Sequence, residues 1–289
     1  MSSSPAGHAA PSTVRPDTET GTHAPLRTFL PTGDGISIDS VYEPGRVVYD
    51  ACTSPAGHPA FASASASATV FVIAHGFTGD VDRPHVRRIA SALGRYGAVV
   101  TFSFRGHGRS GGHSTVGDRE VLDLAAAVEW ARSLGHARVV TVGFSMGGSV
   151  VLRHAALQAG AADAVVSVSA PARWYYRGTA PMRRLHWLVT RPEGRLVGRY
   201  GFRTRIDRRE WDPVPLSPVE AVPRIAPTPL LIVHGDQDGY FPLDHPRMLA
   251  EAAGDHGELW LEPGMGHAEH AADDRLLARI GDWAATRAG

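Results

Sequence analysis

The pattern of apolar and polar residues becomes regular at about residue 69 of this 289-residue chain. From there, short apolar runs rich in β-branched residues alternate with longer segments that carry apolar residues every three or four positions. The short runs predict buried strands at residues 69–74, 98–104, 138–142, 164–169, 229–234 and 258–261. The longer segments predict helices at residues 84–96, 118–134, 244–253 and 276–287, and one that follows residue 145 and ends near residue 160. Apolar strands spaced by helices are typical of an α/β fold, a mostly parallel, doubly wound sheet covered on both faces.

The strand at residues 138–142 leads into Gly143-Phe144-Ser145-Met146-Gly147 and then into an apolar helix. A strand, a sharp turn and a helix around G-x-S-x-G form the context of a nucleophile elbow, which exposes a serine hydroxyl. Side chains at Gly143 and Gly147 are expected to collide with the neighbouring strand and helix. The spacing alone is weak evidence, since Gly108-Arg109-Ser110-Gly111-Gly112 fits it too. Because a polar loop follows that second match, the context favours Ser145.

Three further chemistry-bearing segments follow predicted strands, where ligands of open α/β sheets bind. Residues 75–79, His-Gly-Phe-Thr-Gly, form a glycine turn whose N–H groups could face a site. Residues 235–238, Gly-Asp-Gln-Asp, bring carboxylates, and residues 264–267, Gly-Met-Gly-His, bring an imidazole. The sequence therefore predicts that Ser145, a carboxylate and a histidine meet at one edge of the sheet.

Ser145, Asp238 and His267 follow one another along the chain in the order nucleophile, acid, histidine. In this order the chain resembles the α/β-hydrolase superfamily, over about residues 27 to 287. The loop Phe104-Arg105-Gly106-His107-Gly108-Arg109-Ser110 resembles the R-G-x-G-x-S loop of many members, although Ser103-Phe104 stands where relatives often carry an aspartate. The turn at residues 75–79 is most similar to small bacterial carboxylesterases and monoacylglycerol-lipase-like serine hydrolases. This resemblance implies an α/β-hydrolase fold with a cap insertion.

The resemblance implies a role for each candidate residue. Ser145 is the expected nucleophile, His267 the base and Asp238 the acid that orients the histidine. The N–H groups of Phe77 and Met146 are the expected oxyanion hole, and His75 is expected to orient the turn. Asp236 competes with Asp238 but is expected to bond its own backbone, while His270 and His256 compete with His267. A metal site at His267 and His270 is disfavoured, because no further ligand set accompanies the pair.

Nearly sixty residues separate the strand that ends near Ala170 from the strand that starts at Pro229. Part of this stretch, about residues 172–226, is expected to form a small cap over the site. The expected substrate pocket is lined by Trp174, Tyr175, Trp187 and Trp211. Residues 173–210 also carry eleven arginines against three carboxylates, which indicates either an anionic substrate or surface or an ordinary solvated arginine-rich face.

The composition bounds the remaining possibilities. Lys+Arg and Asp+Glu both number 29, so net charge gives no case for nucleic acid or membrane binding. No apolar stretch approaches the ~20 residues of a membrane span. The single cysteine, Cys52, fits a reducing compartment, and a cytoplasmic location is expected. Residues 1–25 are expected to be a disordered tail and residues 26–289 one α/β-hydrolase domain, with a surface loop at 54–68.

The expected activity is hydrolysis of a small-molecule carboxylic ester through an acyl-enzyme, with no cofactor and no metal. A thioesterase that acts on carrier-bound or CoA-bound acyl groups is the alternative, and the basic cap would suit it. Cofactor-free peroxidase or oxygenase chemistry and a non-catalytic binding protein are further possibilities. Epoxide hydrolases and dehalogenases are disfavoured, because those relatives use a carboxylate nucleophile.

Overall fold

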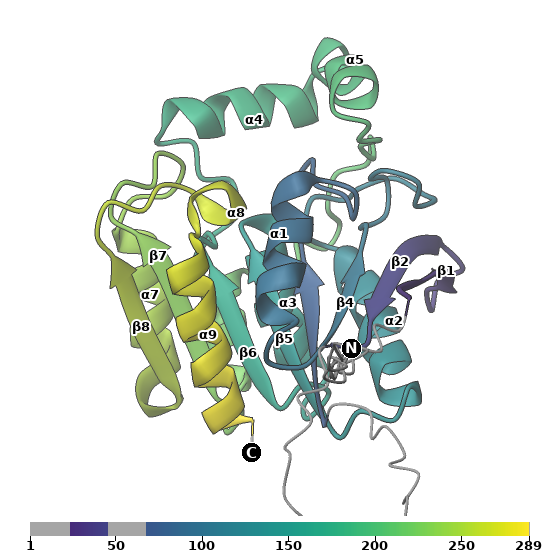
Figure 1. The fold of residues 1–289 in the computed structure, drawn as a ribbon. Coiled ribbons are helices and arrows are strands. Elements are labelled where there is room, and N and C mark those ends of the chain that lie inside the picture. The colour runs from purple at the N-terminus through teal and green to yellow at the C-terminus, as the bar shows by residue number, and fades with distance from the viewer. Residues whose placement is uncertain (1–23, 46–67, 289) are drawn as a thin grey trace, which may run out of the picture.

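The computed structural model describes residues 24–45 and 68–288. The expectations for residues 1–25 and 54–68 therefore lie almost wholly outside the described residues. Eight strands form one sheet in the order β1-β2-β4-β3-β5-β6-β7-β8 (Figure 1). The strands are β1 Leu26–Pro31, β2 Ser37–Glu43, β3 Thr69–Ala74, β4 Ala98–Phe102, β5 Arg138–Phe144, β6 Ala164–Val168, β7 Leu230–Gly235 and β8 Gly257–Glu262.

The six strands from β3 onward are parallel, while β1 and β2 form an antiparallel hairpin that joins the edge of β4. The mostly parallel α/β sheet expected from the sequence is confirmed. Strand β3 pairs with β4 on one side and β5 on the other, so the connections diverge at its carboxyl end. Such a switch point is where open α/β sheets bind ligands, and the turn at residues 75–79 lies there.

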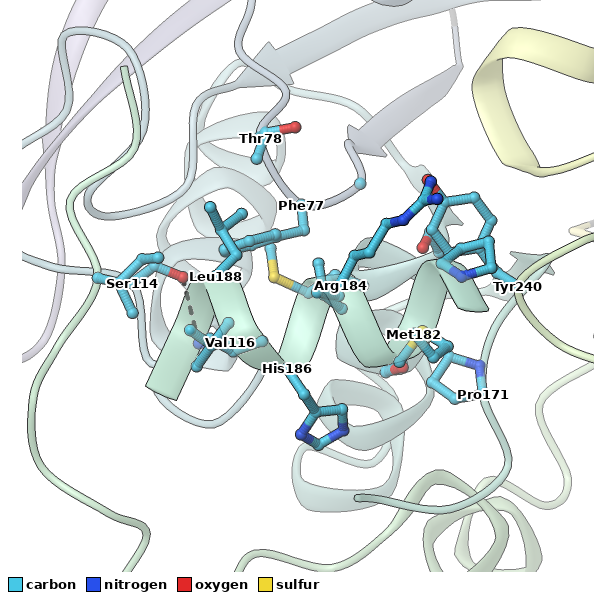
Figure 2. Close-up of a pocket in the computed structure, with 18 of the residues that line it drawn as sticks. Phe77, Thr78, Ser114, Val116, Pro171, Met182, Arg184, His186, Leu188 and Tyr240 are labelled. Atoms are coloured by element: carbon cyan, nitrogen blue, oxygen red, sulfur yellow. Dashed lines mark hydrogen bonds between the residues drawn. The ribbon is translucent and has the colours of Figure 1, made fainter. Parts of the chain in front are cut away.

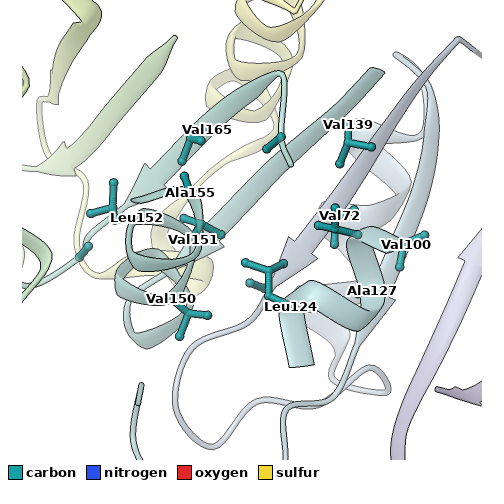
Figure 3. Packing of buried hydrophobic residues seen from close by; sticks show 14 of the residues in the cluster. Val72, Val100, Leu124, Ala127, Val139, Val150, Val151, Leu152, Ala155 and Val165 are labelled. Atoms are coloured by element: carbon teal, nitrogen blue, oxygen red, sulfur yellow. The ribbon is translucent and has the colours of Figure 1, made fainter. Parts of the chain in front are cut away.

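Two helical layers cover the sheet (Figure 1). Helices α1 Pro84–Leu93 and α9 Asp274–Arg287 pack on one face, and α2 Glu120–Ser133, α3 Met146–Leu157 and α7 Asp244–Ala253 pack on the other. Successive side chains of β3 alternate between the two cores. Val70 and Val72 belong to the same core as Leu124 and Val150, whereas Phe71 lies with the α1 and α9 residues. Figure 3 shows Val72 in this core with Leu124 and Val150. The continuous apolar runs of the central strands follow from burial on both faces.

The long connection between β6 and β7 carries helices α4 Ala180–Thr190 and α5 Pro192–Gly201, followed by the short α6 Pro218–Ala221 and a 3-10 turn at Val222–Arg224. Helices α4 and α5 lie above the carboxyl ends of the parallel strands (Figure 1). The returning chain then runs along the loop after β4, with isolated bridges from Thr204 to His107 and from Ile206 to Ser114. The R-G-x-G-x-S loop thus anchors the segment that leaves the cap helices.

Within the described ranges, no helix is both long and apolar enough to cross a bilayer. Two short helical segments complete the chain, a 3-10 turn at Gly254–His256 and α8 at Ala268–Ala271.

Candidate active site

Ser145 stands on a strained turn between β5 and α3. Its φ of 52° and ψ of −113° place it in a region that costs a non-glycine residue on the order of 1–3 kcal/mol. The turn is held by a hydrogen bond from the Ser145 N–H to the Val168 carbonyl at 2.9 Å. A Cβ on Gly147 would overlap the carbonyl of Ala74 in β3, and one on Gly143 would overlap the carbonyl of Gly147 in α3. Both glycines are therefore required for the reason that the sequence indicated.

The structure brings Ser145, His267 and Asp238 together from three separate strand ends. Ser145 Oγ lies 2.9 Å from His267 Nε2, and His267 Nδ1 lies 2.8 Å from Asp238 Oδ2. Since a carboxylate can only accept, Nδ1 carries the proton and Nε2 is left to accept from the Ser145 hydroxyl. This arrangement can remove a proton from the serine and return it to a leaving group.

Asp238 is held in its ionised form inside the protein. Its side chain is 1 % exposed, and its Oδ1 accepts from the N–H groups of Tyr240 and Phe241 at 2.8 and 3.1 Å. Burial by itself would raise the pKa of the carboxyl, but the hydrogen bond and charge of His267 and the Phe241 N–H lower it by more. His234 fixes the same turn by donating from Nε2 to the Phe241 carbonyl at 2.9 Å. The carboxylate that faces His267 is thus both charged and held in place by hydrogen bonds.

The competing residues make contacts other than those of Ser145, His267 and Asp238. The sequence predicted that Asp236 would bond its own backbone. Instead, its Oδ1 accepts from the Gly264 N–H at 2.7 Å. The His270 ring packs against that of His85 with centroids 4.3 Å apart and an interplanar angle of 54°. His256 lies in the 3-10 turn before β8, at the opposite end of that strand from His267. Ser110 of the second G-x-S-x-G match is buried, donating to the Ser103 carbonyl and accepting from the Asp39 N–H.

The turn after β3 holds one peptide group in a fixed orientation. The Gly76 carbonyl accepts from His75 Nδ1 at 2.7 Å and from the Gly79 N–H at 3.0 Å. His75 Nε2 in turn accepts from the Phe104 N–H at 3.0 Å, which fixes the tautomer. Burial of the His75 ring lowers its pKa to about 3, so the ring stays neutral. His75 orients the turn, as the sequence suggested.

Because the peptide group is planar and trans, the Phe77 N–H points away from the side on which the Gly76 carbonyl is held. Met146 is the first residue of α3, where N–H groups have no partner within the helix. Neither N–H donates to another group among the described residues. Phe77 and Met146 line the same cavity as Ser145, so their free N–H groups can receive an oxyanion.

A cavity of about 1170 Å³ lies between the triad and the cap. Figure 2 shows Phe77 and Val116 from the sheet side of the cavity with Met182 and Leu188 from helix α4. All four aromatic residues expected in the pocket line it: Trp174, Tyr175, Trp187 and Trp211. Trp211 donates from Nε1 to the Thr115 carbonyl at 2.7 Å and packs against Trp174 at a ring-centroid distance of 5.1 Å.

Sequence reasoning missed three contributors to the site. The Tyr240 ring stacks on His267 at 4.2 Å with an interplanar angle of 24°. Arg105 forms ion pairs with Asp123 and Asp34, each at 2.8 Å, which tie the loop after β4 to α2 and to the β1–β2 hairpin. Glu269 lines the cavity two residues after His267, and the His-x-Glu spacing could have directed attention to it.

In the part of the chain that the structure describes, no group of three or more His, Cys, Asp or Glu side chains could hold a metal ion.

Residues 71–280 match the model of the alpha/beta hydrolase family. The chain belongs to this family. A curated relative, the monoacylglycerol lipase of Mycolicibacterium smegmatis, is 27% identical over 266 residues, which cover 77% of this chain and 86% of the relative. The resemblance to carboxylesterase-like α/β hydrolases is thereby confirmed.

Solved structures share the fold. The esterase Pf2001 of Pyrococcus furiosus superposes with a TM-score of 0.68 at 21% identity, covering 96% of this chain and 99% of the esterase. XC6422 of Xanthomonas campestris, described as a serine hydrolase without a lid, gives a TM-score of 0.56 at 20% identity and covers 91% and 93% of the two chains. The family and these relatives place the chain among the esterase- and lipase-like hydrolases.

Proposed function

We propose that this protein is a serine hydrolase that cleaves a carboxylic ester through an acyl-enzyme intermediate. The observation that carries the proposal is the continuous hydrogen-bonded chain from Ser145 Oγ through His267 to Asp238, which opens onto a largely apolar cavity. The names of the relatives, a monoacylglycerol lipase and an esterase, support an ester substrate.

In the first half-reaction, Ser145 Oγ attacks the ester carbonyl while His267 Nε2 takes the hydroxyl proton. Asp238 stabilises the imidazolium that forms, and the N–H groups of Phe77 and Met146 donate to the oxyanion of the tetrahedral intermediate. Collapse of this intermediate breaks the ester C–O bond as His267 protonates the departing alcohol. Water, deprotonated by His267, then attacks the acyl-serine and releases the acid.

The cavity is large enough to hold an acyl group of moderate size. The volume of about 1170 Å³ slightly exceeds the ~300–1,000 Å³ of common small-molecule sites. The apolar faces of Met182, Leu188 and Trp211 contact this space. A thioester substrate would use the same steps, but no contact in the site favours sulfur over oxygen, so the ester is the substrate that we propose.

The test is hydrolysis of p-nitrophenyl esters from C2 to C12 by wild type, Ser145→Ala and Ser110→Ala. Ser145→Ala is expected to lose about four to six orders of magnitude in kcat. Ser110→Ala is the matched control, since it alters the other G-x-S-x-G serine, and is expected to retain activity within about tenfold. Wild-type inactivity on every ester, or an active Ser145→Ala, would overturn the proposal.

A further inference from the structure

A buried carboxylate adjoins the site without a counter-ion. The Glu269 residue is 5 % exposed and lines the cavity, and its Oε1 accepts from the Gly76 N–H. No ion pair joins it to an arginine or histidine among the described residues. A buried polar group is costly unless it is hydrogen-bonded, so a carboxyl group with no ion-pair partner beside a reacting serine requires an explanation.

Glu269 completes the restraint on the turn at residues 75–79. The Gly76 carbonyl is held by His75 Nδ1 and the Gly79 N–H, while the Gly76 N–H is held by Glu269. With both polar groups of this residue fixed, rotation about its backbone bonds is restricted. The peptide plane that carries the Phe77 N–H is thereby fixed in orientation.

The carboxylate, the turn and the nucleophile share one small volume. A Cβ built on Gly76 would lie 3.0 Å from Glu269 Oε1, 3.1 Å from Oε2 and 3.3 Å from Ser145 Cβ. Glycine at this position therefore lets the carboxylate approach the turn from the side of Ser145. Glu269 is close enough to the reaction centre that a change in its bonding would alter the site.

The backbone is strained at the residue that precedes Glu269. The preceding residue, Ala268, has a φ of +51°, which costs an alanine roughly 1–2 kcal/mol, and its N–H donates to Ser169 Oγ at 3.1 Å. Arg88 donates from Nη2 to the carbonyls of Glu269 and Ala272 at 3.0 and 2.6 Å. It also pairs with Asp274 at 2.9 Å. Arg88 thus holds helix α8 through its carbonyl groups, while the Glu269 side chain lies buried beside the cavity.

We propose that Glu269 is a positioning residue that orients the Phe77 N–H toward the oxyanion by holding the Gly76 N–H. This inference rests on the proposed esterase function. A carboxyl group serves because its oxygens accept hydrogen bonds. Its acceptor oxygen, and not its charge, is the property that the turn requires. A neutral side chain with the same oxygen is therefore a functional substitute.

The experiment compares Glu269→Gln, which keeps an acceptor oxygen, with Glu269→Met, which keeps the length and lacks the acceptor. Each is assayed for kcat and KM on the best p-nitrophenyl ester and for inhibition by an alkyl trifluoromethyl ketone, whose oxyanion mimics the transition state. Glu269→Met is expected to lose about 100-fold to 300-fold in kcat, within the range for a misplaced or missing oxyanion donor. Its KM is expected to change by less than about threefold, and the inhibitor Ki to rise by the same factor as kcat falls.

Glu269→Gln is expected to stay within about fivefold of wild type in both measurements. Glu251→Gln, on the exposed face of α7, is the control for loss of one negative charge. Circular dichroism melting identifies a variant that does not fold, and Glu269→Ala replaces Glu269→Met in that case.

The inference is overturned if the variant without an acceptor keeps wild-type kcat and Ki, or if Glu269→Gln loses as much as Glu269→Met. A wild type that hydrolyses no ester removes the proposed function and the inference together. An active wild type, an inactive Ser145→Ala and an unaffected Glu269→Met remove the inference alone.

Discussion

Asp236 and Asp238 follow the same strand two residues apart, yet their carboxylates hold opposite ends of one loop. Asp238 Oδ2 lies 2.8 Å from His267 Nδ1, whereas Asp236 Oδ1 accepts from the Gly264 N–H at 2.7 Å. One carboxylate therefore faces the imidazole, and the other fixes the start of the loop that carries it.

The two aspartates form a matched pair for mutation. Asp238→Asn is expected to lower kcat about 10³-fold to 10⁴-fold, because an amide neither fixes the reactive tautomer of His267 nor stabilises its imidazolium. Asp236→Asn retains an acceptor for Gly264 and is expected to stay within about tenfold. Steady-state kinetics on one p-nitrophenyl ester measures both. Equal losses in the two variants would contradict the assignment of Asp238 as the acid.

A second prediction concerns the elbow. Gly147→Ala places a Cβ against the backbone of β3 at the Ala74 carbonyl, which cannot move without breaking the sheet. We expect a loss of more than about 3 kcal/mol in the free energy of unfolding, or no folded protein. Gly33→Ala is the control, since a Cβ there meets nothing within 4 Å. Urea unfolding compares the two, and an unchanged midpoint for Gly147→Ala would contradict the packing described.

The parallel part of the fold could be predicted because its strands are buried on both faces. Residues 69–74 and 244–253 were predicted with the bounds that β3 and α7 have. The β1–β2 hairpin was not located, since β1 is largely exposed and carries no continuous apolar run. Its position depends on long-range contacts such as the ion pair from Arg27 to Asp82 in the segment after β3, which no local pattern reveals.

The predicted nucleophile, acid and base lie together because segments that follow parallel strands all begin at the carboxyl ends of those strands, on one side of the sheet. Asp236 was assigned wrongly to a local turn, since its partner Gly264 belongs to a different strand connection. Tyr240 and Glu269 were missed for the same reason. Their contacts with His267 and Gly76 join segments that the sequence keeps 27 and 193 residues apart.

The third prediction is a loss of stability in mild acid. Burial lowers the pKa of His75 to about 3 and the pKa values of His107 and His154 to about 4. In the unfolded chain these rings bind protons below a pH of about 6.5, so between about pH 6.5 and 4 the unfolded state binds more protons than the folded state. Stability therefore falls as the pH falls, by up to about 1.4 kcal/mol per pH unit for each ring.

Urea titrations at pH 8 and pH 5 measure this effect. His154→Leu removes one buried ring and is expected to lose less stability than wild type between the two pH values. His113→Leu alters an exposed ring and is expected to follow wild type. An identical pH dependence for His154→Leu and wild type would show that the buried ring is not the source.

The last prediction concerns the charge of the substrate. Seven arginines line the cavity against three carboxylates, Asp207, Glu210 and Glu269. Arg173 and Arg209 form ion pairs, whereas the guanidinium of Arg184 on α4 has no hydrogen bond or ion pair within the described residues. Figure 2 shows its side chain among the lining residues. We therefore expect Arg184 to attract an anionic group on the substrate.

A p-nitrophenyl ester of a dicarboxylic acid monoanion is compared with the neutral ester of equal chain length. Arg184→Gln is expected to raise KM for the anionic ester by about twofold to fivefold, the range for a partly exposed ion pair, and to leave the neutral ester unchanged. Arg191→Gln removes the same charge from the cap at a position that does not line the cavity. The Arg184 effect should also shrink between 0.05 and 0.5 M salt, as the Debye length falls below about 5 Å. Equal changes in KM for the two esters would mean that the arginines of the cap form a solvated face with no role in binding.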